Sequence, residues 1–202
     1  MFLAHVLSVT DENVVTFRRS HASLSLDESW TAGDLSFAFR TAQERAVLFH
    51  QVTLPVHVSN IEQNETVDHV HQAANDDVDA FVETQEQSIT NASFKITVLG
   101  PNEIEFAYSL RGVFKTTRLI TEKRINTGEW QHVRVDTDPG FFRFTINESF
   151  LKIDLKERDR LHFPGSLFIG GSADGSDVGL RGCFRGLSIG GKTVKLPDYV
   201  KK

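Results

Sequence analysis

Two glutamates occupy alternate positions in the segment NEIEF, as Glu103 and Glu105. Residues two apart on a β-strand project to the same side, so both carboxylates would share one strand face. Glycosidases with sandwich folds use such paired carboxylates. No third acidic residue completes a known glycosidase signature, and the chain has no nucleophile elbow, phosphate-binding loop or zinc-hydrolase helix. We therefore expect no catalytic residues and no enzyme, and we interpret the pair as carboxylates that keep a strand face soluble.

The segment DHVHQ places His69 and His71 two residues apart, next to Asp68. On a strand the two imidazoles would project to one side, where they could hold zinc or copper. The segment lies in an acidic stretch of the chain, where histidines are commonly solvated. We adopt the solvated interpretation and keep the metal site as its alternative.

The chain has one cysteine, Cys183, in the glycine-flanked segment RGCFRGL. An intramolecular disulfide is therefore excluded. We expect the thiol to be mostly buried as a small hydrophobic group, because the segment reads as a strand that also carries Phe184 and Leu187. A nucleophilic role would need a nearby base and an electropositive setting that the sequence does not reveal.

The elements that must position these groups are short β-strands. Sixteen phenylalanines against five prolines and one methionine, with many runs of Val, Ile and Thr, favour strands over helices. Apolar and polar residues alternate in many segments, and in DLSFAFRT this puts Leu35, Phe37 and Phe39 on one face. The turn sequences LGPNE, NTGE and DPG separate such segments. We predict an all-β antiparallel sandwich without a long helix or a membrane-spanning run.

The 202 residues, 40% of them hydrophobic, suffice for a single domain over residues 1–202. One stretch breaks the strand pattern, because residues 55–90 show no sustained periodicity. It carries much of the net charge of −5, since no Lys or Arg occurs between Ala46 and Phe94. We interpret this acidic stretch as a mobile inserted loop with a functional role. A basic stripe interleaved with aromatic residues is not evident, so nucleic acid is an unfavourable partner.

Several segments together resemble the laminin G-like (LNS) domain family. VVTFRRSHASLSL followed by DLSFAFRTAQERAVLF resembles the family's opening strands, in which F-x-gs-x-y-l precedes i-s-F-x-F-R-T. INTGEWQHVRV resembles its dG-x-W-H-x-V strand, LFIGG its l-y-i-G-G segment, and LRGCFRGLSIGG its closing G-F-x-G-C-i-x-x-l-x-i-n-G segment. These segments occur in family order and cover about 140 of the 202 residues.

The resemblance implies a jelly-roll sandwich of two curved antiparallel sheets, carried by secreted and cell-surface proteins such as laminin α chains, agrin, neurexins and atypical cadherins. We therefore expect an extracellular interaction module of a larger adhesion, receptor or matrix protein. It would bind protein or glycan partners through rim loops, and would meet a membrane only through its parent chain. The alternatives are a carbohydrate-binding lectin domain and a structural spacer without its own ligand.

The resemblance also implies calcium at one rim of the sandwich, held by an Asp before the strand SFKITVL and a second side chain after a long hairpin. Here Ser93 stands at the first position, and Asp159 and His162 stand near the second. Calcium prefers several oxygen ligands, some of them anionic, so this set is degraded. Asp76, Asp77 or Asp79 could substitute only if the acidic loop folds back. We expect no cofactor, with calcium as the alternative.

In the family, the cysteine at the position of Cys183 bonds a second one downstream, which implies a disulfide partner outside this chain. Three sequons, at Asn64, Asn91 and Asn147, favour glycosylation on a secretory route. The alternative for Asn147 is a simple turn residue. Asp174 and Gly175 form a DG pair that we interpret as a flexible turn rather than a calcium loop.

Five basic residues lie close together in the sequence, and relatives of the family often bind sulfated glycans through such clusters. We predict that they share adjacent strands and face no acidic run of equal density. The alternative is a solvated strand face. The residues are Arg111, Lys115, Arg118, Lys123 and Arg124.

Overall fold

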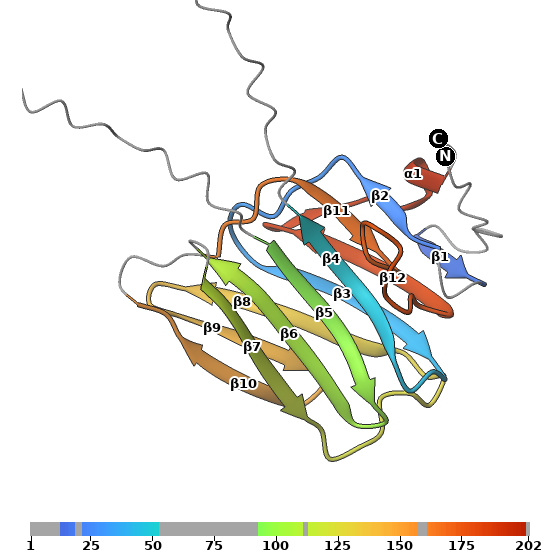
Figure 1. Ribbon diagram of the computed structural model, residues 1–202, viewed down its shortest axis with the longest axis horizontal. Helices are drawn as coiled ribbons and strands as arrows, with labels where there is room; N and C mark the ends of the chain where they lie inside the picture. The colour runs from blue at the N-terminus through green and yellow to red at the C-terminus, as the bar shows by residue number, and fades with distance from the viewer. Residues whose placement is uncertain (1–12, 19–21, 53–92, 111–112, 157–160, 201–202) are drawn as a thin grey trace, which may run out of the picture. The chain divides into compact units, whose positions relative to one another are not determined.

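Alternating apolar residues form two antiparallel β-sheets that pack face to face (Figure 1). The computed structural model describes residues 13–18, 22–52, 93–110, 113–156 and 161–200. They all belong to one compact unit, formed by Met1–Leu54 and Thr90–Lys202. The acidic loop expected at 55–90, with His69 and His71, lies outside the described residues.

The larger sheet has seven strands in the order β1-β12-β3-β8-β9-β10, with β13 paired to β12. All of its pairings are antiparallel. Its strands are β1 (Val14–Phe17), β3 (Leu35–Thr41), β8 (Gln131–Asp138), β9 (Phe141–Ile146), β10 (Ser149–Asp154), β12 (Gly182–Ile189) and β13 (Lys192–Thr193).

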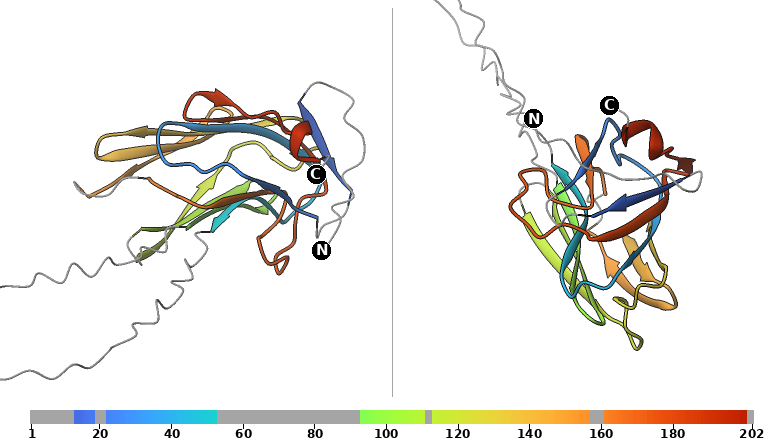
Figure 2. Two further views of the ribbon diagram at one scale, coloured as in Figure 1. Left: turned by 90° about the horizontal axis from the view of Figure 1, so that it is seen from above. Right: turned by 90° about the vertical axis from the view of Figure 1, so that its right-hand side faces the viewer.

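The smaller sheet has six strands in the order β2-β11-β4-β5-β6-β7. Its strands are β2 (Leu24–Leu26), β4 (Ala46–Val52), β5 (Ser93–Gly100), β6 (Glu103–Leu110), β7 (Val113–Ile120) and β11 (Ser166–Ile169). Figure 2 shows the two sheets as the two layers of the sandwich. The prediction of an all-β antiparallel jelly roll is confirmed.

The core fills the space between the sheets and is rich in aromatic rings. Phe37 of the larger sheet stacks on Phe184 at 4.7 Å and on Phe49 of the smaller sheet at 5.6 Å between ring centroids. Phe49 in turn stacks on Phe94, and Trp30 meets Phe94 edge to face. Each such side chain contributes about 1.5–3 kcal/mol when fully buried, so this row of rings ties the two sheets together.

Two predicted turns have the geometry that their sequences favour. Pro101 and Asn102 connect β5 to β6, and Pro139 and Gly140 connect β8 to β9. Gly140 has a φ of 85°, a value that suits glycine at this turn position. In the described residues the one helix is the short α1 (Pro197–Val200), and none is long and apolar enough to cross a membrane.

Candidate functional site

Of the residues expected to hold calcium, Ser93 and His162 belong to the described part of the chain. Ser93 begins β5 and is paired with Val52 and Ser109 in the sheet. His162 places Nδ1 3.0 Å from the carbonyl oxygen of Thr31, so Nδ1 donates this hydrogen bond. Asp159 lies outside the described residues, among which no group of three His, Cys, Asp or Glu side chains could hold a metal.

The basic cluster predicted from the sequence is divided by the structure. Arg118 projects from the outer face of β7 and pairs with Glu103 at 3.4 Å and Glu105 at 3.0 Å, so the expectation of an unopposed cluster is wrong for this residue. Lys115 lies three positions away and therefore on the opposite face of the strand. Lys123 and Arg124 are exposed in the loop after β7, and Arg111 lies outside the described residues.

The ion pairs of Arg118 also give a structural reason for the two glutamates at alternate positions of β6. Glu103 and Glu105 share the outer face of β6, as the alternation predicts, and β6 pairs with β7 so that Glu105 lies opposite Arg118. Opposite charges at facing positions stabilise a sheet by about 0.2–1 kcal/mol. This arrangement gives the carboxylates a structural role on the strand surface.

Asn147 lies at the turn between β9 and β10 with a φ of 50°. Its side-chain oxygen accepts a hydrogen bond from the backbone N–H of His132 at 2.9 Å, and its amide donates to Gln131 at 2.7 Å. Asparagine tolerates this left-handed conformation better than most residues. These contacts support the turn interpretation. The other two sequons, at Asn64 and Asn91, lie outside the described residues.

Cys183 lies in β12 between Thr16 of β1 and Arg40 of β3. The thiol is buried, with 7% of the residue exposed, and its sulfur is 3.5 Å from the hydroxyl of Thr16. The prediction of a mostly buried cysteine is confirmed.

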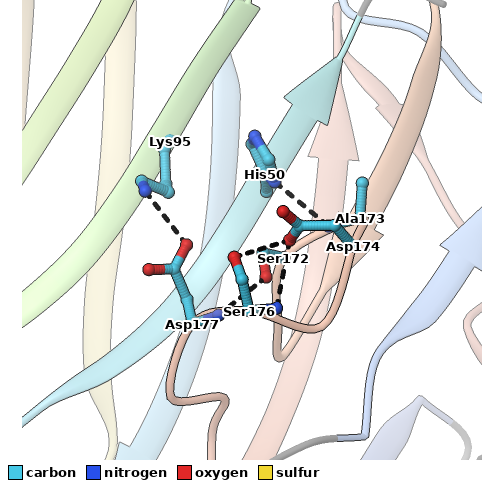
Figure 3. Close-up of polar contacts among 7 residues, drawn as sticks. All are labelled: His50, Lys95, Ser172, Ala173, Asp174, Ser176 and Asp177. Atoms are coloured by element: carbon cyan, nitrogen blue, oxygen red, sulfur yellow. Dashed lines mark hydrogen bonds and ion pairs between the residues drawn. The ribbon is translucent and has the colours of Figure 1, made fainter.

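The Asp174-Gly175 turn belongs to a segment between β11 and β12, here called the glycine loop (residues 170–180). Figure 3 shows that this loop is fastened by its own polar groups. The Asp174 carboxylate accepts hydrogen bonds from the N–H of Ser176 at 3.1 Å and from its hydroxyl at 2.8 Å. These bonds from Ser176 lower the pKa of Asp174 to about 2. The loop is therefore an ordered turn, and the interpretation of Asp174-Gly175 as flexible is wrong.

Two contacts fix the glycine loop to the outer face of the smaller sheet (Figure 3). The backbone N–H of Ala173 donates to Nδ1 of His50 on β4 at 3.1 Å, and Asp177 pairs with Lys95 on β5 at 3.1 Å. Because an N–H can only donate, Nδ1 of His50 must be unprotonated. Burial first, and then the Lys95 ammonium, lower the pKa of His50 from its ordinary value.

A second polar surface lies on the outer face of the larger sheet and was not predicted from the sequence. Two guanidinium groups lie over the ring of Trp130, that of Arg185 at 4.0 Å and that of Arg40 at 5.0 Å from the ring centroid. Ala38 lies between Arg185 and His132 across the strands, and it is only 3% exposed although its neighbours Phe37 and Phe39 face the core. We call Ala38, Arg40, Trp130 and Arg185 the Trp130 face.

Backbone contacts hold Trp130 in place at the start of β8. The N–H of Gly128 donates to the carbonyl of Thr41 at 2.9 Å, which joins the loop to the end of β3. The buried side chain of Gln131 donates to the carbonyl of Glu129 at 3.1 Å and accepts from Asn147. The indole therefore sits on ordered backbone, where two strands present arginines to it.

A model of the laminin G domain family matches residues 81–192, which is more than half of the chain. The chain belongs to the laminin G domain family. Laminin G domains serve as extracellular interaction modules in adhesion proteins and are generally binding modules rather than enzymes. This laminin G domain is 27% identical over 196 residues to Neurexin-4 of Drosophila melanogaster, covering 94% of the chain. It spans only 12% of the length of that relative.

Solved structures with the same fold include other laminin G domains. The LG1-3 region of the laminin alpha2 chain superposes with a TM-score of 0.61 at 11% identity, covering 95% of this chain and 34% of that one. Mouse laminin alpha1 chain domains LG4-5 superpose with a TM-score of 0.58 at 11% identity, covering 98% of this chain and 46% of that one. The CBM40 domain of a Ruminococcus gnavus sialidase, bound to alpha2,3 sialyllactose, gives 0.54 at 10% identity, covering 95% and 96%. At these identities the likeness is one of fold.

The Trp130 face joins three of the segments that carry the family resemblance. Arg40 comes from DLSFAFRT, Trp130 from INTGEWQHVRV and Arg185 from LRGCFRGLSIGG. The sequence offers one signal for their meeting, which is that all three lie on strands or strand ends of the same predicted sandwich. The order of strands in the sheet, which brings β12 and β8 to opposite sides of β3, comes from the structure.

Proposed function

We propose that this laminin G domain is an extracellular interaction module of a larger adhesion, receptor or matrix protein, and that it binds protein or glycan partners. The family match carries this proposal, together with the small share of Neurexin-4 that the chain spans. A domain that makes up 12% of such a relative is expected to contribute binding rather than a complete activity.

The test is a binding screen of the isolated domain against extracellular protein ectodomains and a glycan array in parallel. We expect selective binding to at least one member of either set. Failure to bind in both sets would favour the structural spacer, which contacts only neighbouring domains of its own chain. Binding confined to oligosaccharides of the glycan array, with no protein partner, would favour the lectin alternative. The CBM40 structure, named as bound to a sialylated sugar and matching 95% of this chain, motivates that alternative.

Whether partner binding depends on calcium is a separate question with its own test. The residues at the expected rim do not fit a hard cation well, because His162 offers a nitrogen and Ser93 an uncharged hydroxyl. We therefore propose that partner binding is independent of calcium. Partner binding measured in EGTA and in millimolar calcium should agree, and a requirement for calcium would contradict the proposal.

A further inference from the structure

We propose that two copies of this chain associate through the open edge of the smaller sheet, where β7 of one copy pairs antiparallel with β7 of the other. β7 ends the strand order of this sheet and has β6 as its one neighbour among the described strands (Figure 1). It has eight residues, whereas β10, β1 and β2 at the other sheet ends have six, four and three. Natural proteins commonly shorten, bulge or cover such an edge, which otherwise pairs with other chains.

β7 is a regular strand with an apolar surface. Its pairing with β6 runs from Val113 to Ile120 without a shift in register, and its sequence VFKTTRLI contains neither proline nor glycine. Three of the five large apolar side chains that are exposed among the described residues lie on this strand. Phe114 at 68% and Ile120 at 70% are the most exposed of the five. An exposed, regular and apolar edge is a template for pairing with another strand.

The backbone of β7 has donors and acceptors left for such a partner. The N–H of Thr121 donates to the carbonyl of Asn102 at 2.8 Å, which makes them a hydrogen-bonded pair one step beyond the end of the β6–β7 ladder. Hydrogen-bonded and non-hydrogen-bonded pairs alternate along an antiparallel ladder, so every second residue of β7 directs its N–H and C=O to the open side. Their side chains share the outer face. These open residues are Phe114, Thr116, Arg118 and Ile120.

The open residues match a second copy of themselves. Phe114 and Ile120 lie three positions on either side of Thr117, so a twofold axis at Thr117 brings Phe114 opposite Ile120 of the second copy. The same axis brings Thr116 opposite Arg118. The symmetry repeats both pairs, so the two most exposed apolar side chains cover each other at both ends of the interface. Facing apolar side chains stabilise a sheet, and a twofold dimer requires a self-complementary patch.

The charges of β7 favour this register. Arg118 is already paired within its own sheet with two glutamates of β6, at 3.4 and 3.0 Å. Lys115 would lie opposite Leu119 of the second copy rather than opposite its own copy. Sliding one strand by two residues in one direction sets Arg118 opposite its own copy, and like charges at facing positions are unfavourable. Sliding it in the other direction leaves Ile120 without a facing residue on the strand.

The symmetry favours a second copy over an extended peptide of another protein. A foreign peptide needs an open edge, but it does not need apolar side chains placed evenly about one residue. Each hydrogen-bonded pair of the new ladder exchanges two N–H···O bonds, so the open residues of both copies give about eight bonds across the interface. This dimer goes beyond the proposed function, because partner binding by the module neither requires nor predicts it.

The first experiment measures self-association of the whole chain by sedimentation velocity over a wide concentration series. The test variants are Phe114→Glu and Ile120→Lys, each of which sets a charge opposite an apolar side chain of the second copy. The double variant Phe114→Glu/Ile120→Lys sets opposite charges in facing positions. The matched control is Val178→Glu, which changes an exposed apolar residue of the glycine loop, outside β7. Circular dichroism and thermal melting establish that each variant is folded.

We expect the original chain to form a reversible dimer. Each single variant should weaken it at least tenfold, and the double variant should dimerise at least threefold more tightly than either single variant. Val178→Glu should stay within twofold of the original chain, and an equal loss in this control would overturn the proposal. Failure of the double variant to recover would overturn the register. An original chain that stays monomeric throughout would overturn the dimer, and loss of a screened protein partner in Phe114→Glu would then assign the edge to that partner.

The second experiment needs no change of charge and tests the register directly. Thr117 would face its own copy in a non-hydrogen-bonded pair, in which Cα atoms are about 4.5 Å apart and within the range of a disulfide. Under mild oxidation, Thr117→Cys should give at least tenfold more disulfide-linked dimer than Thr116→Cys, which would face Arg118. Thr116 is exposed and Thr117 half-buried, so random collision would give the opposite order. Buried Cys183 is the same background in both variants. Equal or reversed yields would overturn the pairing, while binding in the screen of extracellular partners would still support the proposed function.

Discussion

Replacing Gly170 by alanine should destabilise the fold by about 2–5 kcal/mol, the combined cost of backbone strain and overpacking. Gly170 follows β11 with a φ of +77°, in the region that L-residues with a Cβ rarely adopt. A Cβ placed there would lie 2.6 Å from the ring of Phe17, which is itself only 1% exposed. The backbone at Gly170 cannot easily move, because its N–H donates to Leu48 at 3.0 Å and its carbonyl accepts from Leu180 at 2.7 Å. The ring of Phe17 cannot easily move either, because it is buried in the core.

Gly175→Ala is the matched control within the same glycine loop. Its φ of +70° is almost the same, but no atom lies within 4 Å of the added Cβ. It should therefore cost only the backbone part, about 1–2 kcal/mol. The difference between the two variants isolates the contact with Phe17.

Urea unfolding followed by tryptophan fluorescence provides the assay, since Trp30 is fully buried in the core. An unchanged m-value would show that both variants unfold from a similarly compact state. Equal losses of stability for Gly170→Ala and Gly175→Ala would refute the reasoning, because the close approach to Phe17 would then cost nothing.

Three further outcomes are expected. The pKa of His50 is lower in the folded chain than in the unfolded chain, so the unfolded chain binds more protons than the folded one as the pH falls. The contribution of neutral His50 to the free energy of unfolding is therefore complete above pH 6.5 and declines as the pH falls below that value. The stability lost between pH 7.5 and 5.5 should be smaller in His50→Gln than in the original chain, and equal losses would count against this. Native Cys183 should react with a bulky thiol reagent far more slowly than in urea, and a rapid native phase would show the thiol to be accessible. Asn147→Ala should cost about 1–3 kcal/mol by chemical denaturation, through the strained φ and the lost bond to His132. Asn147→Gly should recover the backbone part, and no recovery would argue that the side chain alone matters.

The alternation of apolar and polar residues within each strand predicted which side chains face the core. Leu35, Phe37 and Phe39 are buried on one face as expected. Ala38 is the exception, since it faces outward by periodicity and yet is 3% exposed. The groups beside it come from residues about 90 and 150 positions away, and only the order of strands in the sheet brings them together.

The basic cluster shows how nearness in sequence can mislead on a strand. Lys115 and Arg118 differ by an odd number of positions, so alternation alone already places them on opposite faces. The pairing of Arg118 with Glu105 depends on the register of the β6–β7 hairpin. The sequence could have predicted this register, because a short connection between two strands fixes how a hairpin pairs. The Trp130 face could not be predicted in this way, because its three sequence motifs meet through pairings of strands that are distant in the sequence.

The strand order also has a consequence for how the chain is made. β12 lies between β1 and β3, and β11 lies between β2 and β4, so the N-terminal strands lack neighbours until the last quarter of the chain exists. Thr16 and Cys183, which face each other, are 167 residues apart. At translation rates of about 5–20 residues per second, the first strands wait roughly 8–33 s for their partners. During that interval their apolar faces are open to chaperones, and a ribosome-stalled chain that ends before Ser166 should remain protease-sensitive throughout.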